Sequence, residues 1–318
     1  MIVIVDQTGD YHARVVAHHL EKRGVGSFIA DIRELGTGSE LSFWPAAPEQ
    51  TEWRRRDGSA VRMSEVGAIW FRRLYPPETP IEVDDREERS FIAREWSSTV
   101  RGVFASLDVP TINPIYAMAR ATKPYQLALA RRAGLAVPDT LITSSSSRAV
   151  EFVSAPGDSV HKVITSPHGR FLATKLWDDC DTRHLPDLEL APTIFQRRVG
   201  GKRELRITVV GDRLFAAEYS TELVDGRTDM AAAYVRHDLP PSVERRLLSF
   251  LDQLELPFAT VDMRIDARGE YWFLEANNAG QFLWIEVRTG LPISAAVADL
   301  LCESRVRQSR AGMNLMAR

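Results

Sequence analysis

Apolar blocks alternate with an amphipathic block in the first third of the chain, and this order predicts a β-α-β unit. Residues 2–5 are uniformly apolar, residues 11–21 place apolar side chains at helical spacing, and residues 28–30 are apolar again. A strand, a helix and a second strand in this order favour a parallel sheet. Residues 66–71 predict a further buried strand, and a long helix is expected to follow and to end near residue 107.

Short strands and helices alternate in the rest of the chain, beyond a break at Asn113-Pro114. Thr122 and Pro124 are typical of the N-cap and first turn of a helix, which we expect to end near Gly134. Runs that favour strands follow at residues 140–143, 160–164, 170–176, 194–199, 205–210 and 214–219. Two more helices are predicted by apolar spacing, around Val243, Leu247, Leu251 and Leu254, and around Ile293, Val297, Leu300 and Leu301.

Two runs near the C-terminal end each place polar side chains on an otherwise apolar strand. Asp262 lies in the first run, and Glu275 and Asn277 lie two residues apart in the second. The turn at residues 266–269 predicts a hairpin, and side chains two apart on a strand share a face. Glu275 and Asn277 should therefore point the same way, with Asp262 opposite them. Two carboxylates and an amide are hard oxygen ligands that suit Mg²⁺, which commonly accompanies nucleotide phosphates.

Composition and charge narrow the class of protein. The chain has 318 residues, which favours two or three domains, and 44% hydrophobic with 26% charged residues is typical of a soluble globular protein. A net charge of −3 provides no basic field for nucleic acid or an anionic membrane. Cys180 and Cys302 are far apart, which favours a reducing compartment. We expect a cytoplasmic protein without a signal peptide or a membrane span.

Several lysine and arginine residues lie at positions where a positive charge is unfavourable unless it has a suitable partner. Lys162 lies within an apolar strand, which is costly unless it meets an anion or its ammonium extends to solvent. Lys123 lies at a helix start, where the helix dipole disfavours a cation. Arg206 lies within a strand and could grip a phosphate or a carboxylate, or form an ordinary cross-strand ion pair. The loop at residues 166–170, which includes His168, could fold over phosphates, although its single glycine is a weak signal.

The order of these parts resembles the ATP-grasp superfamily, over about residues 113–301. The resemblance implies an α/β (α+β) ATP-grasp fold preceded by a parallel-sheet pre-ATP-grasp domain. The domains it implies are an N-terminal pre-ATP-grasp domain at residues 1–115, a central ATP-grasp subdomain at 116–196, a C-terminal subdomain with the metal site at 197–303 and a flexible tail at 304–318.

Two segments narrow the resemblance to the microviridin-type maturases, or graspetide synthetases. These segments are Ile69-Trp70-Phe71-Arg72-Arg73 and the run from Asn277 to Glu286. Asn278 departs from the pattern, because many relatives have proline after the metal-binding asparagine. Arg197-Arg198 also departs from it, because relatives often carry an acid and an aromatic residue in this hinge.

The resemblance implies roles for individual residues. The nucleotide-binding set is Lys123, Lys162, Gln196, Arg198, Val199 and Glu204. In that set the two lysines would bind the α- and β-phosphates, residues 196–199 would line the adenine edge, and the glutamate would accept hydrogen bonds from ribose. The metal ligands would be Asp262, Glu275 and Asn277, which would hold two Mg²⁺ ions.

The remaining implied roles concern the reacting groups. Arg206 would stabilise the γ-phosphate or an acyl phosphate, and Arg264 would hold the acceptor carboxylate. Arg72 and Arg73 would grip an acidic substrate peptide.

The activity that the resemblance implies is an ATP-dependent ligase with an acyl-phosphate intermediate. It would activate Glu or Asp side chains of a ribosomal precursor peptide, which has a leader and an acidic, Thr-rich core, and close ω-ester or ω-amide rings. The resemblance also implies a homodimer. Two alternatives stay open: a RimK-like ligase that adds an amino acid to a protein or peptide, and a nucleotide-binding regulator without catalysis.

Overall fold

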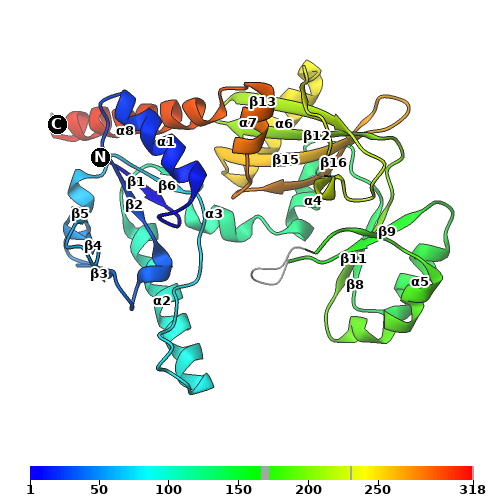
Figure 1. Cartoon of the computed structure of the whole chain (residues 1–318), viewed down its shortest axis with the longest axis horizontal. Coiled ribbons are helices and arrows are strands. Elements are labelled where there is room, and N and C mark those ends of the chain that lie inside the picture. Colours follow the sequence, from blue (N-terminus) through cyan, green and yellow to red (C-terminus); the bar gives the residue numbers. More distant parts are fainter. Residues whose placement is uncertain (166–171, 230, 317–318) are drawn as a thin grey trace.

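The computed structural model describes residues 1–165, 172–229 and 231–316, with side chains up to residue 305 except that of Asp179 (Figure 1). Its first part is built on a four-stranded parallel sheet with the strand order β2-β1-β6-β7. The elements are β1 (Ile2–Val5), α1 (Tyr11–Lys22), β2 (Ser27–Ala30), β6 (Ala68–Phe71), α2 (Arg86–Ser106) and β7 (Thr111–Ile112). The predicted β-α-β unit and the parallel sheet are confirmed.

Alternate residues of β1 face two different cores. Ile2 and Ile4 pack with α1 and α8 (Ile293–Met316) on one face of the sheet. Val3 and Val5 pack with α2 and with a small antiparallel sheet on the other face. That sheet has the order β3-β4-β5 and consists of Glu40–Ser42, Glu52–Arg54 and Ala60–Arg62. A parallel sheet buried on both faces explains why its strands are uniformly apolar.

A second, antiparallel sheet of four strands lies in the middle of the chain, with the order β10-β9-β11-β8. Its strands are β8 (Thr140–Thr143), β9 (Ser159–Lys162), β10 (Lys175–Leu176) and β11 (Thr193–Arg197), and α5 (Ser146–Ser154) covers it. Within the described part of the strand predicted over residues 170–176, which begins at residue 172, Lys175 and Leu176 pair with β9. Residues 166–171, with the predicted phosphate loop and His168, lie outside the described residues.

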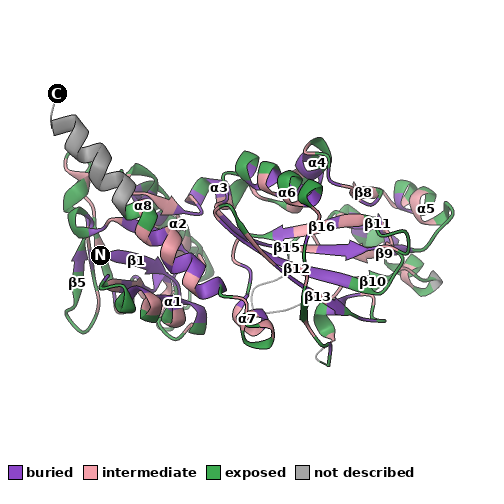
Figure 2. Ribbon diagram, turned by 90° about the horizontal axis from the view of Figure 1, so that it is seen from above, coloured by how far each residue is buried: buried purple, intermediate pink, exposed green. Residues whose placement is uncertain are grey.

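The third large sheet has five antiparallel strands in the order β14-β13-β12-β15-β16. Its strands are β12 (Arg203–Val210), β13 (Arg213–Ser220), β14 (Val235–Arg236), β15 (Phe258–Ile265) and β16 (Tyr271–Asn277). The predicted hairpin of β15 and β16 is present, and β12 and β13 form a second antiparallel hairpin. One face packs on α4 (Lys123–Arg132) and α6 (Pro241–Leu254), and Figure 2 shows the resulting buried middle strands. Val210, Ala217 and Phe258 belong to the core that includes α8, and the rest of the sheet's opposite face can carry a site.

The C-terminal elements join the first and third sheets. The short helix α7 (Leu283–Thr289) leads from β16 to α8, and α8 packs on α1 and β6 of the first part. Another short helix, α3 (Ile115–Arg120), leads from β7 to α4. Helix α8 continues to Met316 and includes most of the tail at residues 304–318, whose predicted flexibility stays a prediction. Cys180 and Cys302 are both free, as expected. In the described part of the chain, no helix is long and apolar enough to cross a membrane.

Candidate functional site

Asp262 and Glu275 lie directly opposite each other in the hairpin of β15 and β16. Arg206 of β12 lies opposite Asp262 on the other side, so the three residues form a row across three strands. Directly opposed residues in an antiparallel pair point to the same face of the sheet. The strand alternation seen in the sequence therefore placed the two carboxylates correctly.

The carboxylate of Asp262 is held by Arg206. The Nη1 atom of Arg206 donates to Oδ1 at 2.7 Å and to Oδ2 at 2.9 Å, and its Nη2 atom donates to the Gln281 carbonyl at 3.3 Å. Burial raises the pKa of the Asp262 carboxyl, while the Arg206 guanidinium opposes this shift by stabilising the charged form. The neighbouring carboxylate of Glu275 adds to the upward shift.

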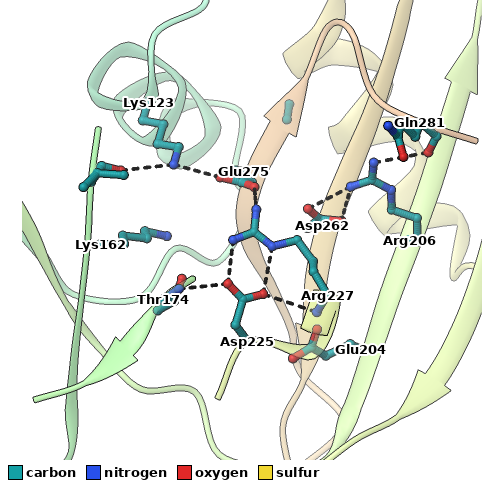
Figure 3. A network of polar contacts seen from close by, with 12 residues as sticks. Lys123, Lys162, Thr174, Glu204, Arg206, Asp225, Arg227, Asp262, Glu275 and Gln281 are labelled. Atoms are coloured by element: carbon teal, nitrogen blue, oxygen red, sulfur yellow. Dashed lines mark hydrogen bonds and ion pairs between the residues drawn. The ribbon is translucent and has the colours of Figure 1, made fainter. Parts of the chain in front are cut away.

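Glu275 lies between two cations (Figure 3). Lys123 Nζ is 3.2 Å from Oε2, and Arg227 Nη1 is 2.7 Å from Oε1. Burial alone would raise the pKa of Glu275, but Lys123, Arg227 and Lys162 together hold it below its usual value. Glu275 is thus the anion that offsets the unfavourable position of Lys123 at the first residue of α4.

Asp225 and Arg227 complete this network, and neither was predicted from the sequence. Arg227 donates to both carboxylate oxygens of Asp225, at 2.8 and 2.7 Å, while Asp225 also accepts a hydrogen bond from the Thr174 amide at 2.8 Å. Asp225 caps a short 3-10 helix, Gly226–Thr228, between β13 and β14, and Arg227 lies in that helix. A helix of three residues is too short for apolar periodicity to predict it. An aspartate and an arginine two residues apart do not by themselves indicate a functional site.

A first cavity opens between the four-stranded and the five-stranded antiparallel sheets. Most predicted nucleotide-binding residues line it, together with two of the metal ligands: Lys162, Gln196, Arg198, Val199, Glu204, Asp262 and Glu275. Asp225 and Arg227, which the sequence did not single out, also lie on its wall. The predicted residues come from β9, β11, β12, β15 and β16 and from the segment after β11, so the fold brings them together from distant parts of the chain.

Lys162 extends into this cavity from β9. Its Nζ atom donates to Gln196 Oε1 at 3.1 Å, and Gln196 in turn donates to Thr140 Oγ1 at 2.8 Å. Burial lowers the pKa of Lys162 to about 8, although Glu275 partly opposes the shift. A largely buried ammonium with one neutral hydrogen-bond partner is prepared to meet an anionic ligand.

Glu204 and Arg264 form a nearly buried ion pair on the cavity wall. Arg264 Nη2 lies 2.8 Å from Glu204 Oε1, and Tyr219 donates to Glu204 Oε2 at 2.6 Å. Burial raises the pKa of Glu204, opposed by Arg264. The structure therefore places Arg264 beside the predicted ribose-binding glutamate and the Val199 carbonyl, on the nucleotide side of the site. Its predicted contact with an acceptor carboxylate stays a prediction.

A second cavity lies on the other side of the row formed by Arg206, Asp262 and Glu275. Its lining comprises Arg73, Arg206, Tyr219, Arg227, Asp229, Tyr234, Asp262, Glu275, Asn277, Ala279, Gln281, Trp284 and Arg288. Four arginines face three acidic residues in this set. Tyr234 stacks edge-on against Trp284 at 4.6 Å, and the Arg288 guanidinium lies 5.2 Å from the Tyr234 ring. Asp262, Glu275 and Arg227 line both cavities, so the two meet at these residues.

The two arginines predicted to grip a peptide have different environments. Arg73 lines the second cavity and donates to the Tyr75 hydroxyl at 2.8 Å. Arg72 is 0% exposed and donates to the Ala279 carbonyl at 2.6 Å. A side chain without exposed surface has no free face for a peptide, so of the two only Arg73 is placed for that role.

The predicted magnesium ligands offer the kind of oxygen atoms that Mg²⁺ binds. Among the described residues, no group of three or more His, Cys, Asp or Glu side chains could hold a metal by itself. Asp262 and Glu275 supply two carboxylates, and Asn277 adds an exposed amide at the end of β16. Mg²⁺ is usually bound in this way, by one or two carboxylates together with phosphate oxygens and water.

Comparisons with known proteins agree with this geometry. Residues 1–119 match the family model of the MvdD pre-ATP grasp domain. A search of curated proteins gives no match. Among solved structures, the macrocyclase MdnC from Microcystis aeruginosa, bound with precursor peptide MdnA, is similar with a TM-score of 0.86 and 26% identity over 95% of this chain and 99% of that one.

Two further structures extend the comparison. A RiPP-associated ATP-grasp ligase from Chryseobacterium gregarium, in complex with ADP and a leader and core peptide, has a TM-score of 0.84 and 25% identity, over 95% of this chain and 96% of that one. The ATP-grasp ligase PsnB, complexed with a precursor variant, Mg and ADP, shares the fold with a TM-score of 0.82 and 23% identity, over 96% and 98% of the two chains. Residues 1–119 therefore match the MvdD pre-ATP grasp domain, and the chain as a whole shares the fold of ATP-grasp macrocyclases of ribosomal peptides, to which it is similar.

Proposed function

We propose that the chain is an ATP-dependent ligase that closes ester or amide rings in a ribosomal precursor peptide. The observation that carries this proposal is that two cavities meet at Asp262, Glu275 and Arg227. A protein that only senses a nucleotide needs one cavity. A ligase needs a second one, from which an acceptor group can reach the phosphoryl group.

The first cavity suits ATP. Lys162 on its wall supplies positive charge for phosphates, and Lys123 lies next to the cavity through its ion pair with Glu275. Glu204 presents a carboxylate that can accept hydrogen bonds from ribose hydroxyls. Asp262, Glu275 and Asn277 would hold Mg²⁺, and we propose two ions. When bound, Mg²⁺ neutralises phosphate charge and orients the γ-phosphoryl group.

The second cavity suits an acidic side chain. Arg73, Arg206 and Arg288 supply positive charge there, and Arg206 is anchored at the row of Asp262 and Glu275. A Glu or Asp carboxylate of the peptide would attack the γ-phosphorus while its bond to the bridging oxygen of ADP breaks. The products of this step are ADP and an acyl phosphate.

Ring closure follows from the same geometry. A Ser or Thr hydroxyl or a Lys amine of the same peptide attacks the acyl carbon, its proton is lost, and inorganic phosphate leaves. An ester or an amide then joins two side chains. Holding both groups of one chain together makes the reaction intramolecular, which lowers the entropic part of the barrier.

The substrate class rests on similarity over nearly the whole length of both chains. MdnC and the Chryseobacterium ligase are complexed with their peptides, and this chain covers 99% and 96% of those proteins. A RimK-like ligase that adds an amino acid would use the same nucleotide cavity, and it is distinguished by its product. A regulator without catalysis would not need the second cavity.

Mass spectrometry of a candidate precursor peptide after incubation with the protein, ATP and Mg²⁺ tests the proposal. The matched control is Glu275→Gln. We expect a loss of about 18 Da, one water, for each ring closed, and no loss with the variant. A gain equal to one amino acid would instead support the RimK-like ligase. Nucleotide binding without any change in peptide mass would support a regulator.

A further inference from the structure

The loop at residues 278–282, between β16 and α7, connects directly to the predicted magnesium site. The Ala279 amide in this loop donates to Asn277 Oδ1 at 2.9 Å, and the Gln281 carbonyl accepts from Arg206 at 3.3 Å. The path of the 278–282 loop therefore determines where the Asn277 amide and the Arg206 guanidinium point.

Three side chains from the first 113 residues hold this loop. Arg72 Nη1 donates to the Ala279 carbonyl at 2.6 Å, and Asn113 Nδ2 donates to the Asn278 carbonyl at 2.8 Å. The Nε2 atom of His12 accepts from the amides of Phe282 and Leu283, at 3.2 and 3.4 Å. Four backbone groups in or next to the 278–282 loop are thus bound by side chains from the first sheet and its connections.

These three side chains are buried. Arg72 and Asn113 are 0% exposed and His12 is 8% exposed. Because Nε2 of His12 accepts, its proton lies on Nδ1, which is 3.3 Å from Asp10 Oδ1. The same ring packs edge-on against Phe282, with centroids 4.8 Å apart. Buried polar groups of this kind define one geometry because the alternative leaves a donor or acceptor unpaired.

The opposite side of the 278–282 loop packs closely against β15. A Cβ atom added at Gly280 would lie 1.6 Å from Thr260 Oγ1, so the backbone at this position contacts β15 directly. Asn113 also accepts from the amide of Phe258, the first residue of β15, at 3.0 Å. One asparagine therefore joins the 278–282 loop to the strand that carries Asp262.

We infer that His12, Arg72 and Asn113 are positioning residues for the metal site, through which the pre-ATP-grasp domain sets the geometry of Asn277 and Arg206. This inference rests on the proposed function, because it assumes that the site binds a metal nucleotide. It assigns the first domain a part in catalysis that does not require contact with the peptide. It also gives Arg72 a role consistent with its complete burial.

Substitutions at His12 test the inference with Mn²⁺ as the probe. His12→Leu removes the acceptor for two amides, whereas His12→Gln keeps an acceptor oxygen near the position of Nε2. We expect His12→Leu to weaken Mn²⁺ binding in the presence of ADP about tenfold, measured from the free Mn²⁺ signal by electron paramagnetic resonance, and His12→Gln to restore most of it. Amides of residues 278–284 should exchange hydrogen faster in His12→Leu than in the parent.

Two controls separate positioning from general damage. His18→Leu alters an exposed histidine on the same helix and should match the parent. ADP affinity in EDTA should stay unchanged in His12→Leu, because the nucleotide cavity is intact. If His12→Leu does not fold, Arg72→Lys keeps the buried charge but lacks the planar guanidinium, and it should weaken Mn²⁺ binding in the same direction.

The outcomes distinguish the inference from the function on which it rests. A parent protein that binds ADP and Mn²⁺ together with a His12→Leu variant that equals it in both Mn²⁺ affinity and amide exchange would overturn the positioning inference alone. A parent protein that binds no Mn²⁺ with ADP would overturn the proposed function, and the inference with it. Equal loss of ADP affinity with and without metal would show a structural role only.

Discussion

The two faces of the five-stranded sheet are built from the same strands, but one is apolar and the other is charged. One face carries Leu205, Ile207, Val261, Met263 and Phe273, which form a dry core with α4 and α6. The other face carries Glu204, Arg206, Asp262, Arg264 and Glu275, which are joined by ion pairs and line the cavities. Neighbouring residues in β12 and β15 thus belong to opposite environments. In β16 a register shift opposite Asp262 and Met263 lets Phe273 face the apolar core and Glu275 the polar side.

Side chains of a regular strand point alternately to its two faces, so one strand can contribute both to the hydrophobic core and to the site. The apolar face supplies the free energy that keeps the strands in register. The polar face costs free energy, because buried charges lose hydration, and it is tolerated because each charge has a partner. Changes on the first face should therefore affect folding, and changes on the second should affect ligand binding and catalysis.

The largest effect is expected from Phe273→Ala on the apolar face. Phe273 is fully buried and stacks edge-on against Phe250 of α6 at 5.0 Å. The truncation should lower the free energy of unfolding by about 3–5 kcal/mol, measured by urea denaturation. ADP affinity of the folded protein should change little. A loss of ADP affinity without a loss of stability would contradict the division between the faces.

Glu275→Gln tests the polar face. The substitution keeps the shape of the side chain but removes the charge that binds Lys123, Arg227 and the predicted metal. We expect ring formation to fall on the order of 100-fold or more, with a smaller loss of stability than Phe273→Ala causes. The rate of product formation at saturating ATP and peptide measures this effect. Near-normal turnover would exclude Glu275 as a metal ligand.

A pH profile sharpens the comparison further. Lys162 should carry its charge below pH 8, because burial lowers its pKa to about 8. Above that pH the ammonium loses its proton and the phosphates lose a cationic partner, so kcat/KM for ATP should fall, approaching about tenfold per pH unit. Lys162→Arg should remove this alkaline decline, since arginine stays protonated. The same decline in Lys162→Arg would assign it to another group.

The smallest effect is expected from Tyr219→Phe. This change removes only the hydroxyl that donates to Glu204 at 2.6 Å, while Arg264 still holds the carboxylate. Loss of one such hydrogen bond costs on the order of 1 kcal/mol, so KM for ATP should rise about fivefold. A much larger fall in kcat would indicate that Tyr219 acts on the peptide side, where it lines the second cavity.

The sequence predicted best those parts of the site that follow a local rule. Strand alternation placed Asp262 opposite Glu275, and the helix dipole indicated that Lys123 lies near an anion. The parallel sheet follows from the order of apolar blocks, and the hairpin of β15 and β16 follows from the turn at residues 266–269. The order of these parts also supported the resemblance to the ATP-grasp superfamily.

The parts that were missed depend on long-range packing. Arg227 and Asp225 reach the site from a short 3-10 helix and its cap, where no period distinguishes a site residue from a solvated one. Arg72 was expected to contact a peptide because the family resemblance implied that role. In the structure Arg72 is buried and donates to the Ala279 carbonyl of the 278–282 loop, more than 200 residues later in the chain. Local patterns cannot show which distant segment covers a strand end.

The most direct test of the account follows the oxygen atoms of the substrate. A precursor peptide labelled with ¹⁸O in its Glu and Asp side-chain carboxylates would be incubated with the protein, ATP and Mg²⁺. If the carboxylate attacks the γ-phosphorus where the two cavities meet, one ¹⁸O atom should appear in inorganic phosphate for each ring formed, with ADP as the other product. Rings formed without label in phosphate, or with label in AMP, would contradict the proposed chemistry.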